Sequence, residues 1–235
     1  MSAPTLINGP DAVTAWLAGA QEVLRQREVF NLVTTIEHPC VVEPQWLTQY
    51  SPRARSLGRE DIRDVVDTIF PLDLARRYPE RQEFYSQYLR RHDRAMRMRR
   101  NASTWGTYFE RLIRFPGSDA NQLEQVIDKL TTWQVRSTTA LVFHLSTPAI
   151  DRPRTRGGPC WHFGEVIWNR DDTLDLVVVY RNHDFFNKAL GNFLALGQLL
   201  RFICEASGKE SGQLVSHSIH AYNGGLVSTL REMMG

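Results

Sequence analysis

Cysteines are scarce in this sequence, and no two of them lie close together. The 235 residues contain Cys40, Cys160 and Cys204 but no Cys-x-x-Cys pair. Structural zinc sites and disulfide frameworks need closely spaced or paired cysteines, so the sequence argues against both and we expect no bound metal. A few widely spaced thiols are typical of a reducing compartment, and we therefore expect a cytoplasmic location.

Long apolar runs and an excess of one charge are also absent from the sequence. No apolar stretch reaches the roughly 18 residues that span a bilayer, and residues 1–17 lack the layout of a signal peptide. The 28 basic and 26 acidic side chains nearly balance at a net charge of +2, which argues against nucleic-acid and membrane-surface binding. With 42% hydrophobic residues, the chain is expected to form a single domain over residues 1–235.

Hydrophobic periodicity predicts helices and strands in mixed order. Helices are expected at 12–27, 60–70, 79–100, 123–132 and 188–206, and strands at 29–36, 139–145, 163–168, 174–180 and 214–219. The helix at 188–206 is apolar on nearly all sides, which indicates an interior position. The strands on either side of Asp171 and Asp172 indicate a hairpin. We therefore predict the α+β class, with a large mixed or antiparallel sheet packed against helices and a buried central helix.

Cys160 is the candidate nucleophile of the sequence. A thiolate is the most nucleophilic side chain near neutral pH once its pKa is lowered. Arg154, Arg156 and Arg181 are basic residues that could lower the pKa of Cys160. The alternative is an inert cysteine in the core, which is the interpretation favoured for Cys204 on the apolar helix.

The polar residues that follow Cys160 suit the binding of a ring with an anionic tail. Arg181 ends an apolar strand, where a guanidinium group can pair with a phosphate or a carboxylate. The carboxamide of Asn192 offers a donor and an acceptor, as needed to read uracil O4 and N3–H. His220 and Tyr222 alternate along an extended segment, so they point to one face and could hold sugar hydroxyls. The alternatives are a strand-end ion pair, a helix-bridging Asn and ordinary polar residues on a sheet.

Taken in order, these segments resemble the thymidylate synthase and deoxycytidylate hydroxymethylase superfamily. The matching segments are Pro159-Cys160, Arg181-Asn182-His183-Asp184, Gly191-Asn192-Phe193 and His220-Ala221-Tyr222-Asn223, within a stretch from about Gln122 to Asn223. The resemblance implies a thymidylate synthase-like fold and a transferase. In such an enzyme, Cys160 would add to C6 of a pyrimidine nucleoside monophosphate. A methyl or hydroxymethyl group would then pass to C5 from 5,10-methylenetetrahydrofolate.

The same resemblance implies a role for each further site residue. The 5′-phosphate would be held by Arg181 and Arg136, in a motif that also contains Asn182. Asn192 would read uracil, and Asp184 would lie near the folate. The remaining positions are Asp64, which would shuttle protons, and His220 and Tyr222, which would bind the 3′-hydroxyl group.

The sequence also departs from the family pattern. Asn182 replaces a serine, Trp161 replaces a histidine, and Trp105-Gly106 stands where the family has Tyr-Gly. The chain ends 13 residues after Tyr222, where the family continues with a section that helps to build the folate site. Two alternatives therefore stay open: a folate-independent enzyme that uses the same thiol addition, and a non-catalytic nucleotide-binding module. Family members are two-fold dimers packed through their sheets, so the resemblance also implies a homodimer.

Overall fold

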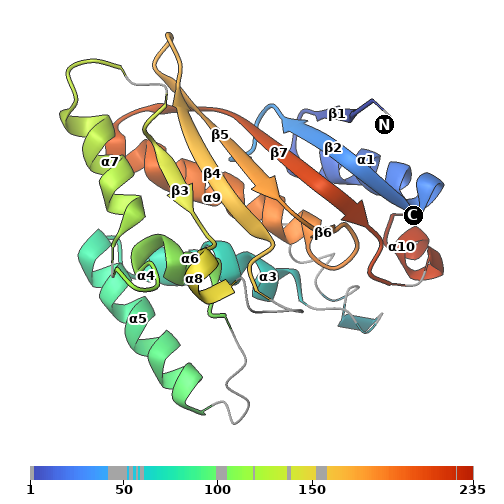
Figure 1. The fold of residues 1–235 in the computed structure, drawn as a ribbon, viewed down its shortest axis with the longest axis horizontal. Helices are drawn as coiled ribbons and strands as arrows, with labels where there is room; N and C mark the ends of the chain where they lie inside the picture. Colours follow the sequence, from blue (N-terminus) through green and yellow to red (C-terminus); the bar gives the residue numbers. More distant parts are fainter. Residues whose placement is uncertain are drawn as a thin grey trace.

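A mixed sheet of seven strands forms the centre of the protein (Figure 1). The computed structural model describes residues 3–41, 52, 55–56, 58, 61–98, 105–118, 120–136, 139–151, 158–225 and 227–234. The strands follow the order β1-β2-β7-β5-β4-β3, and β6 pairs with β7 beside this path. Their bounds are β1 Thr5–Gly9, β2 Glu28–Ile36, β3 Val142–His144, β4 Trp161–Trp168, β5 Thr173–Tyr180, β6 His183–Asp184 and β7 Glu210–Tyr222.

The pairing of the strands fixes the path of the chain around the site. β4 and β5 form the predicted antiparallel hairpin, with Asp172 in its turn at φ 70°. β5 and β7 are parallel neighbours. Parallel strands cannot be joined by a tight turn, so the chain between them must cross the sheet. It does so through the helix α9 (Ala189–Ser207), which passes behind the strands in Figure 1.

The helix α9 is the buried central helix that the sequence predicts. Of its 19 residues, 14 are buried. It packs against α1 (Ala12–Gln26), α3 (Ile62–Ile69) and α7 (Gln122–Thr132). Gly191 allows the close approach of α3, because a Cβ atom there would lie 2.7 Å from the side chain of Val65. This approach brings α3 next to Asn192.

Short elements that the sequence analysis did not predict complete the fold. They are β1, β6 and the helices α4 (Leu72–Arg77), α6 (Tyr108–Ile113), α8 (Pro148–Asp151) and α10 (Val227–Met234), while α5 (Arg81–Met98) falls within the predicted helix at 79–100. The α+β class is confirmed. No helix within the described ranges is long and apolar enough to cross a membrane.

A buried ion pair fixes the segment that precedes the site. Arg111 on α6 is 1% exposed. Its guanidinium group donates to both carboxylate oxygens of Asp151 at 2.6 and 2.9 Å, to Leu145 O at 2.8 Å and to Trp105 O at 3.1 Å. A buried guanidinium group is tolerated only when its donors are paired. Arg111 therefore holds Trp105, the end of β3 and α8 in one arrangement.

Candidate active site

A cavity of about 270 Å³ opens beside Cys160. Five of the predicted site residues line it: Cys160, Asn182, Asp184, Asn192 and Tyr222. The rest of its wall is formed by Thr68, Trp105, Tyr108, Gly158, Tyr180, His183 and Lys188. The fold thus gathers a thiol, two carboxamides, a carboxylate and an ammonium group around one space.

The backbone on both sides of Cys160 is held by hydrogen bonds. The hydroxyl group of Tyr108 accepts from the backbone N–H groups of Cys160 at 3.0 Å and Trp161 at 3.2 Å. The backbone N–H of Arg181 donates to Cys160 O at 2.9 Å, and its side-chain Nε donates to Pro159 O at 3.1 Å. Cys160 is therefore fixed between α6 and the end of β5.

Burial and the surrounding charges together set the protonation state of the Cys160 thiol. Burial raises the pKa of Cys160 above its ordinary value, Arg181 and Lys188 lower it, and Asp184 raises it. Because burial is the largest of these effects, the thiol holds its proton at neutral pH. The expectation for Cys204 is confirmed, since it is 4% exposed on α9 and burial raises its pKa to about 12.

Asn192 faces the cavity from α9 and is held by a histidine behind it. It is 4% exposed, and its Nδ2 atom lies 3.1 Å from Nε2 of His183. On the other side of the ring, Nδ1 of His183 lies 2.8 Å from Oγ of Ser218. Burial lowers the pKa of His183 to about 3, so the ring is neutral at physiological pH.

His220 and Tyr222 share one face of β7, as the alternation along the segment predicts. Their rings stack with centroids 5.4 Å apart and an interplanar angle of 13°. Nδ1 of His220 lies 2.8 Å from Oδ1 of Asn182, and its Nε2 lies 2.9 Å from a carboxylate oxygen of Glu28. Tyr222 and Asn182 line the cavity. His220 thus supports the cavity through Asn182.

Asp184 anchors the turn that leads into α9. Its Oδ1 atom accepts from the backbone N–H groups of Phe186 and Asn187, each at 3.0 Å, and of Gly224 at 3.2 Å. The carboxylate also raises the pKa of Cys160. Asp184 therefore shapes the cavity and adds negative charge beside the thiol.

Four predicted residues do not line the cavity. Arg181 and His220 adjoin it through their contacts with Pro159 O and Asn182, whereas Asp64 and Arg136 do not. Asp64 is exposed on α3, and its neighbour Thr68 is the residue of this helix that lines the cavity. Nη1 of Arg136 donates to Trp168 O at 3.2 Å, at the far end of β4. That end lies roughly 23 Å along the strand from Trp161, at 3.3 Å per residue. Arg136 is therefore remote from Cys160 within one chain.

The structure adds site residues that sequence reasoning missed. Trp105, which stands where the family has a tyrosine, lines the cavity. A tyrosine hydroxyl group does contact the Cys160 segment, but it comes from Tyr108. Lys188 and His183 also follow Cys160 in the sequence, but the sequence analysis predicted no role for either side chain in the site. On α3, partial burial of the carboxyl group, with Asp73 and Asp64 beside it, raises the pKa of Asp67 to about 6, although the residue as a whole is exposed. Arg154 and Arg156, named as possible activators of Cys160, lie outside the described residues.

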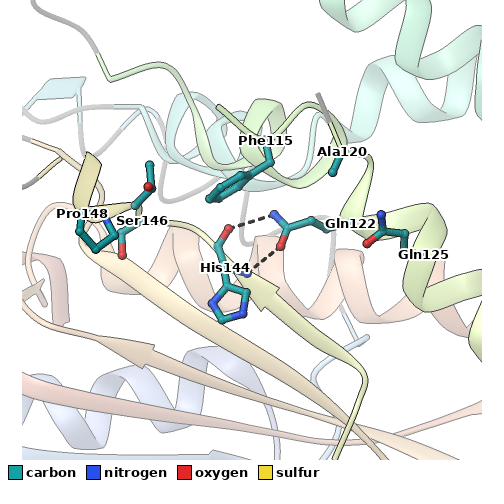
Figure 2. Close-up of a pocket in the computed structure, with 8 residues that line it drawn as sticks. Phe115, Ala120, Gln122, Gln125, His144, Ser146 and Pro148 are labelled. Atoms are coloured by element: carbon teal, nitrogen blue, oxygen red, sulfur yellow. Dashed lines mark hydrogen bonds between the residues drawn. The ribbon is translucent and has the colours of Figure 1, made fainter. Parts of the chain in front are cut away.

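A second cavity of about 280 Å³ lies between the end of β3 and α7 (Figure 2). The carboxamide of Gln122 spans its floor, where Nε2 donates to His144 O at 2.9 Å and Oε1 accepts from His144 N–H at 2.8 Å. No Cys, Asp, Glu, Lys or Arg occurs among its described lining residues. The cavity beside Cys160, by contrast, combines a thiol with the ammonium group of Lys188.

The fold belongs to the α+β class, with a mixed sheet packed against helices, and is consistent with a thymidylate synthase-like fold. Comparison with known proteins agrees with this class. Over 117 residues the chain is 32% identical to a protein of Methanococcoides burtonii and 31% identical to one of Methanosarcina mazei, each named "Putative thymidylate synthase". No family model matches the chain.

The aligned stretch covers 49% of the chain and 51% of either relative, so the chain spans about half the length of the curated relatives it matches. The predicted resemblance is confirmed at this level.

Proposed function

We propose that this protein transfers a one-carbon unit to C5 of a uridylate-type 5′-monophosphate through an adduct between the thiolate of Cys160 and C6 of the ring. The observation that carries the proposal is the cavity that joins the Cys160 thiol to the Asn192 carboxamide and to Lys188. Arg181 lies next to the Cys160 segment, because its Nε donates a hydrogen bond to the carbonyl group of Pro159. A nucleophile, a group that reads a base and two cations for a phosphate are thus neighbours.

The proposed chemistry begins when the Cys160 thiol loses its proton. Arg181 and Lys188 favour the thiolate, and the sulfur then bonds to C6 while the electron pair of the C5=C6 bond moves toward C5 and O4. An N–H donor of Asn192 stabilises the charge that develops on O4. The bound cofactor would supply the carbon and keep the nitrogen from which that carbon departs; water would complete a hydroxymethyl group, or a hydride from the reduced cofactor a methyl group. On the side of the protein, an acid-base group accepts the C5 proton, and the bond between C6 and the Cys160 sulfur breaks, which returns the thiolate and restores the ring.

Proton transfer needs an acid-base group near the cavity. Asp64 stays a prediction from the resemblance. Asp67 is a second candidate on the same helix, because its pKa of about 6 lies closer to neutral pH. It precedes Thr68, which lines the cavity. The hydroxyl group of Tyr108 is a third, since it contacts the backbone of Cys160.

We propose 5,10-methylenetetrahydrofolate as the cofactor, which would supply the carbon that is transferred. The residues present fit a flat ring system, because Trp105 and Tyr108 give the cavity aromatic walls. Their rings lie 4.6 Å apart between centroids. Asp184 would be the carboxylate nearest to such a ring.

We also propose a cytoplasmic homodimer that packs through its sheets. Val177 and Val179 on β5 and Val215 and Ile219 on β7 alternate with buried residues and are half-buried or exposed. Together with His217 and Asp175, which lie on the same side of the sheet, they form a largely apolar face that a second copy can cover. In such a dimer Arg136 of each chain would reach the phosphate in the cavity of its partner.

A transfer assay with a labelled one-carbon donor tests the proposal. Deoxyuridine, uridine and deoxycytidine 5′-monophosphates are incubated with labelled methylenetetrahydrofolate, and label at C5 is expected with a uridylate. Cys160→Ala should abolish the transfer. Cys40→Ala is the matched control, because the thiol of Cys40 does not line the cavity and donates a hydrogen bond to Gly197 O instead. No transfer to any of the three nucleotides would reject the proposal.

A further inference from the structure

The buried ring of His183 is a side chain that the proposed chemistry does not use. It is 1% exposed, and it lies directly behind Asn192 in the wall of the cavity. We propose that His183 is a positioning residue that holds the Asn192 carboxamide in the orientation that reads uracil and rejects cytosine. This inference rests on the proposed function, because it concerns how the same cavity selects its base.

The contacts of His183 determine where its ring proton lies. One nitrogen, Nδ1, is 2.8 Å from Oγ of Ser218, and the other, Nε2, is 3.1 Å from Nδ2 of Asn192. A neutral imidazole carries one N–H donor and one acceptor. Since an amide NH₂ group only donates, Nε2 must be the acceptor, and the proton lies on Nδ1 and is donated to Ser218. Burial keeps the ring in this neutral form, because it lowers the pKa of His183 to about 3.

The orientation of the amide decides which base it reads. With one Nδ2 hydrogen donated to His183, Asn192 presents its second Nδ2 hydrogen and Oδ1 as a donor and an acceptor. This pair matches O4 and N3–H of uracil. In the opposite orientation Oδ1 would face Nε2, and the amide would match the N3 acceptor and N4 donor of cytosine. With the ring proton on Nδ1, that orientation places two acceptors against each other and is disfavoured. It would require the proton to move to Nε2 and the hydroxyl group of Ser218 to donate to Nδ1, so the proposal assigns the Nδ1–H tautomer to His183.

Packing prevents the imidazole from turning to exchange its two nitrogens. The ring stacks on Tyr180 with centroids 4.1 Å apart and an interplanar angle of 4°. The edges of Phe185 and Phe193 close on it at 5.2 and 5.6 Å between centroids. Turning the ring would also break both of its hydrogen bonds inside the core. The tautomer, the amide orientation and the choice of base are therefore coupled.

Dissociation constants for deoxyuridine and deoxycytidine 5′-monophosphate test this coupling by isothermal titration calorimetry. The wild-type protein should prefer the uridylate. His183→Phe keeps an aromatic ring on Tyr180 but removes the acceptor, so the ratio of the two constants should fall by roughly tenfold or more. His183→Gln supplies a carbonyl acceptor for Nδ2 and should restore much of the ratio. Phe185→Leu is the packing control and should leave the ratio unchanged.

The outcomes separate this inference from the function on which it rests. Preference for uridylate in the wild type that persists in His183→Phe would overturn the role of His183 and leave the proposed function intact. If the preference for uridylate is lost in both His183→Phe and His183→Gln, the hydrogen-bond argument is overturned. Binding of neither nucleotide by the wild type would reject both proposals. If His183→Phe does not fold, Ser218→Ala takes its place: it removes the partner of Nδ1, and an unchanged ratio there would overturn the inference.

Discussion

Acid should destabilise this protein through His183, by an amount that follows from its burial. The pKa of His183 is lowered from an ordinary value of 6.5 to about 3 because the ring lies in the core. Below pH 6.5 the unfolded chain takes up a proton at this residue and the folded chain does not. The stabilising contribution is therefore complete above pH 6.5 and is lost as the pH falls toward 3.

The size of the effect is large enough to measure. One pH unit in this window corresponds to about 1.4 kcal/mol. Between pH 7.5 and 4.5, His183 alone should lower the free energy of unfolding by about 2.6 kcal/mol. Asp67 acts in the opposite sense, because its raised pKa of about 6 means that the folded state binds the proton more tightly. The comparison must therefore be made against a variant at position 183.

Urea unfolding at a series of pH values, followed by circular dichroism, measures this difference. We expect the wild-type free energy of unfolding to fall more steeply than that of His183→Gln, so that the difference between the two free energies changes by about 2.6 kcal/mol between pH 7.5 and 4.5. All other titrating groups are shared, so they cancel in the comparison. Parallel curves for the two proteins would refute the claim that this histidine is buried in its neutral form.

Three further predictions concern the ion pair and the cavity. Asp151→Asn leaves the buried guanidinium group of Arg111 without its carboxylate, and urea unfolding should show a loss of about 3–5 kcal/mol; a loss below 1 kcal/mol would contradict the buried pair. Alkylation of Cys160, followed by mass spectrometry, should have its midpoint above the pH of an ordinary thiol, because burial raises its pKa. Arg181→Gln should move that midpoint further up, and a downward shift would contradict the charge argument. Asn192→Asp replaces the amide donor with a carboxylate, so the affinity for uridylate, measured by calorimetry, should fall about tenfold or more; equal affinity would remove Asn192 from base recognition.

The elements that periodicity predicts well are those with a strong burial pattern. The helix α9 was predicted at 188–206 and is observed at Ala189–Ser207, because apolar residues on nearly all of its sides are in fact buried. The β4–β5 hairpin is predicted correctly because two apolar segments flank the polar turn at Asp171 and Asp172. By contrast, α6 has six residues and β6 has two, which is too short for a period to be visible. The strand β7 begins four residues before the predicted start because polar residues at its edge still pair with β5.

The candidate site is only partly predictable from the sequence. The order of Cys160, Asn192 and Tyr222 predicted that they meet, and they line one cavity. No sequence pattern indicates the role of His183, because its stacking on Tyr180 and its hydrogen bond to Asn192 depend on the distances between the strands and the helix. Arg136 was placed at the phosphate by resemblance, whereas within one chain it lies at the far end of β4. Contacts across a sheet or between copies leave no periodic trace in the sequence.

Exchange of the C5 hydrogen of a uridylate in deuterium oxide, without any cofactor, tests the central claim most directly. Addition of the Cys160 sulfur to C6 makes C5 basic, so nuclear magnetic resonance should show the C5 proton replaced by deuterium. The signal should be lost with Cys160→Ala and kept with Cys40→Ala. Exchange that continues in Cys160→Ala, or a wild-type protein that binds uridylate and catalyses no exchange, would contradict covalent addition by this thiol.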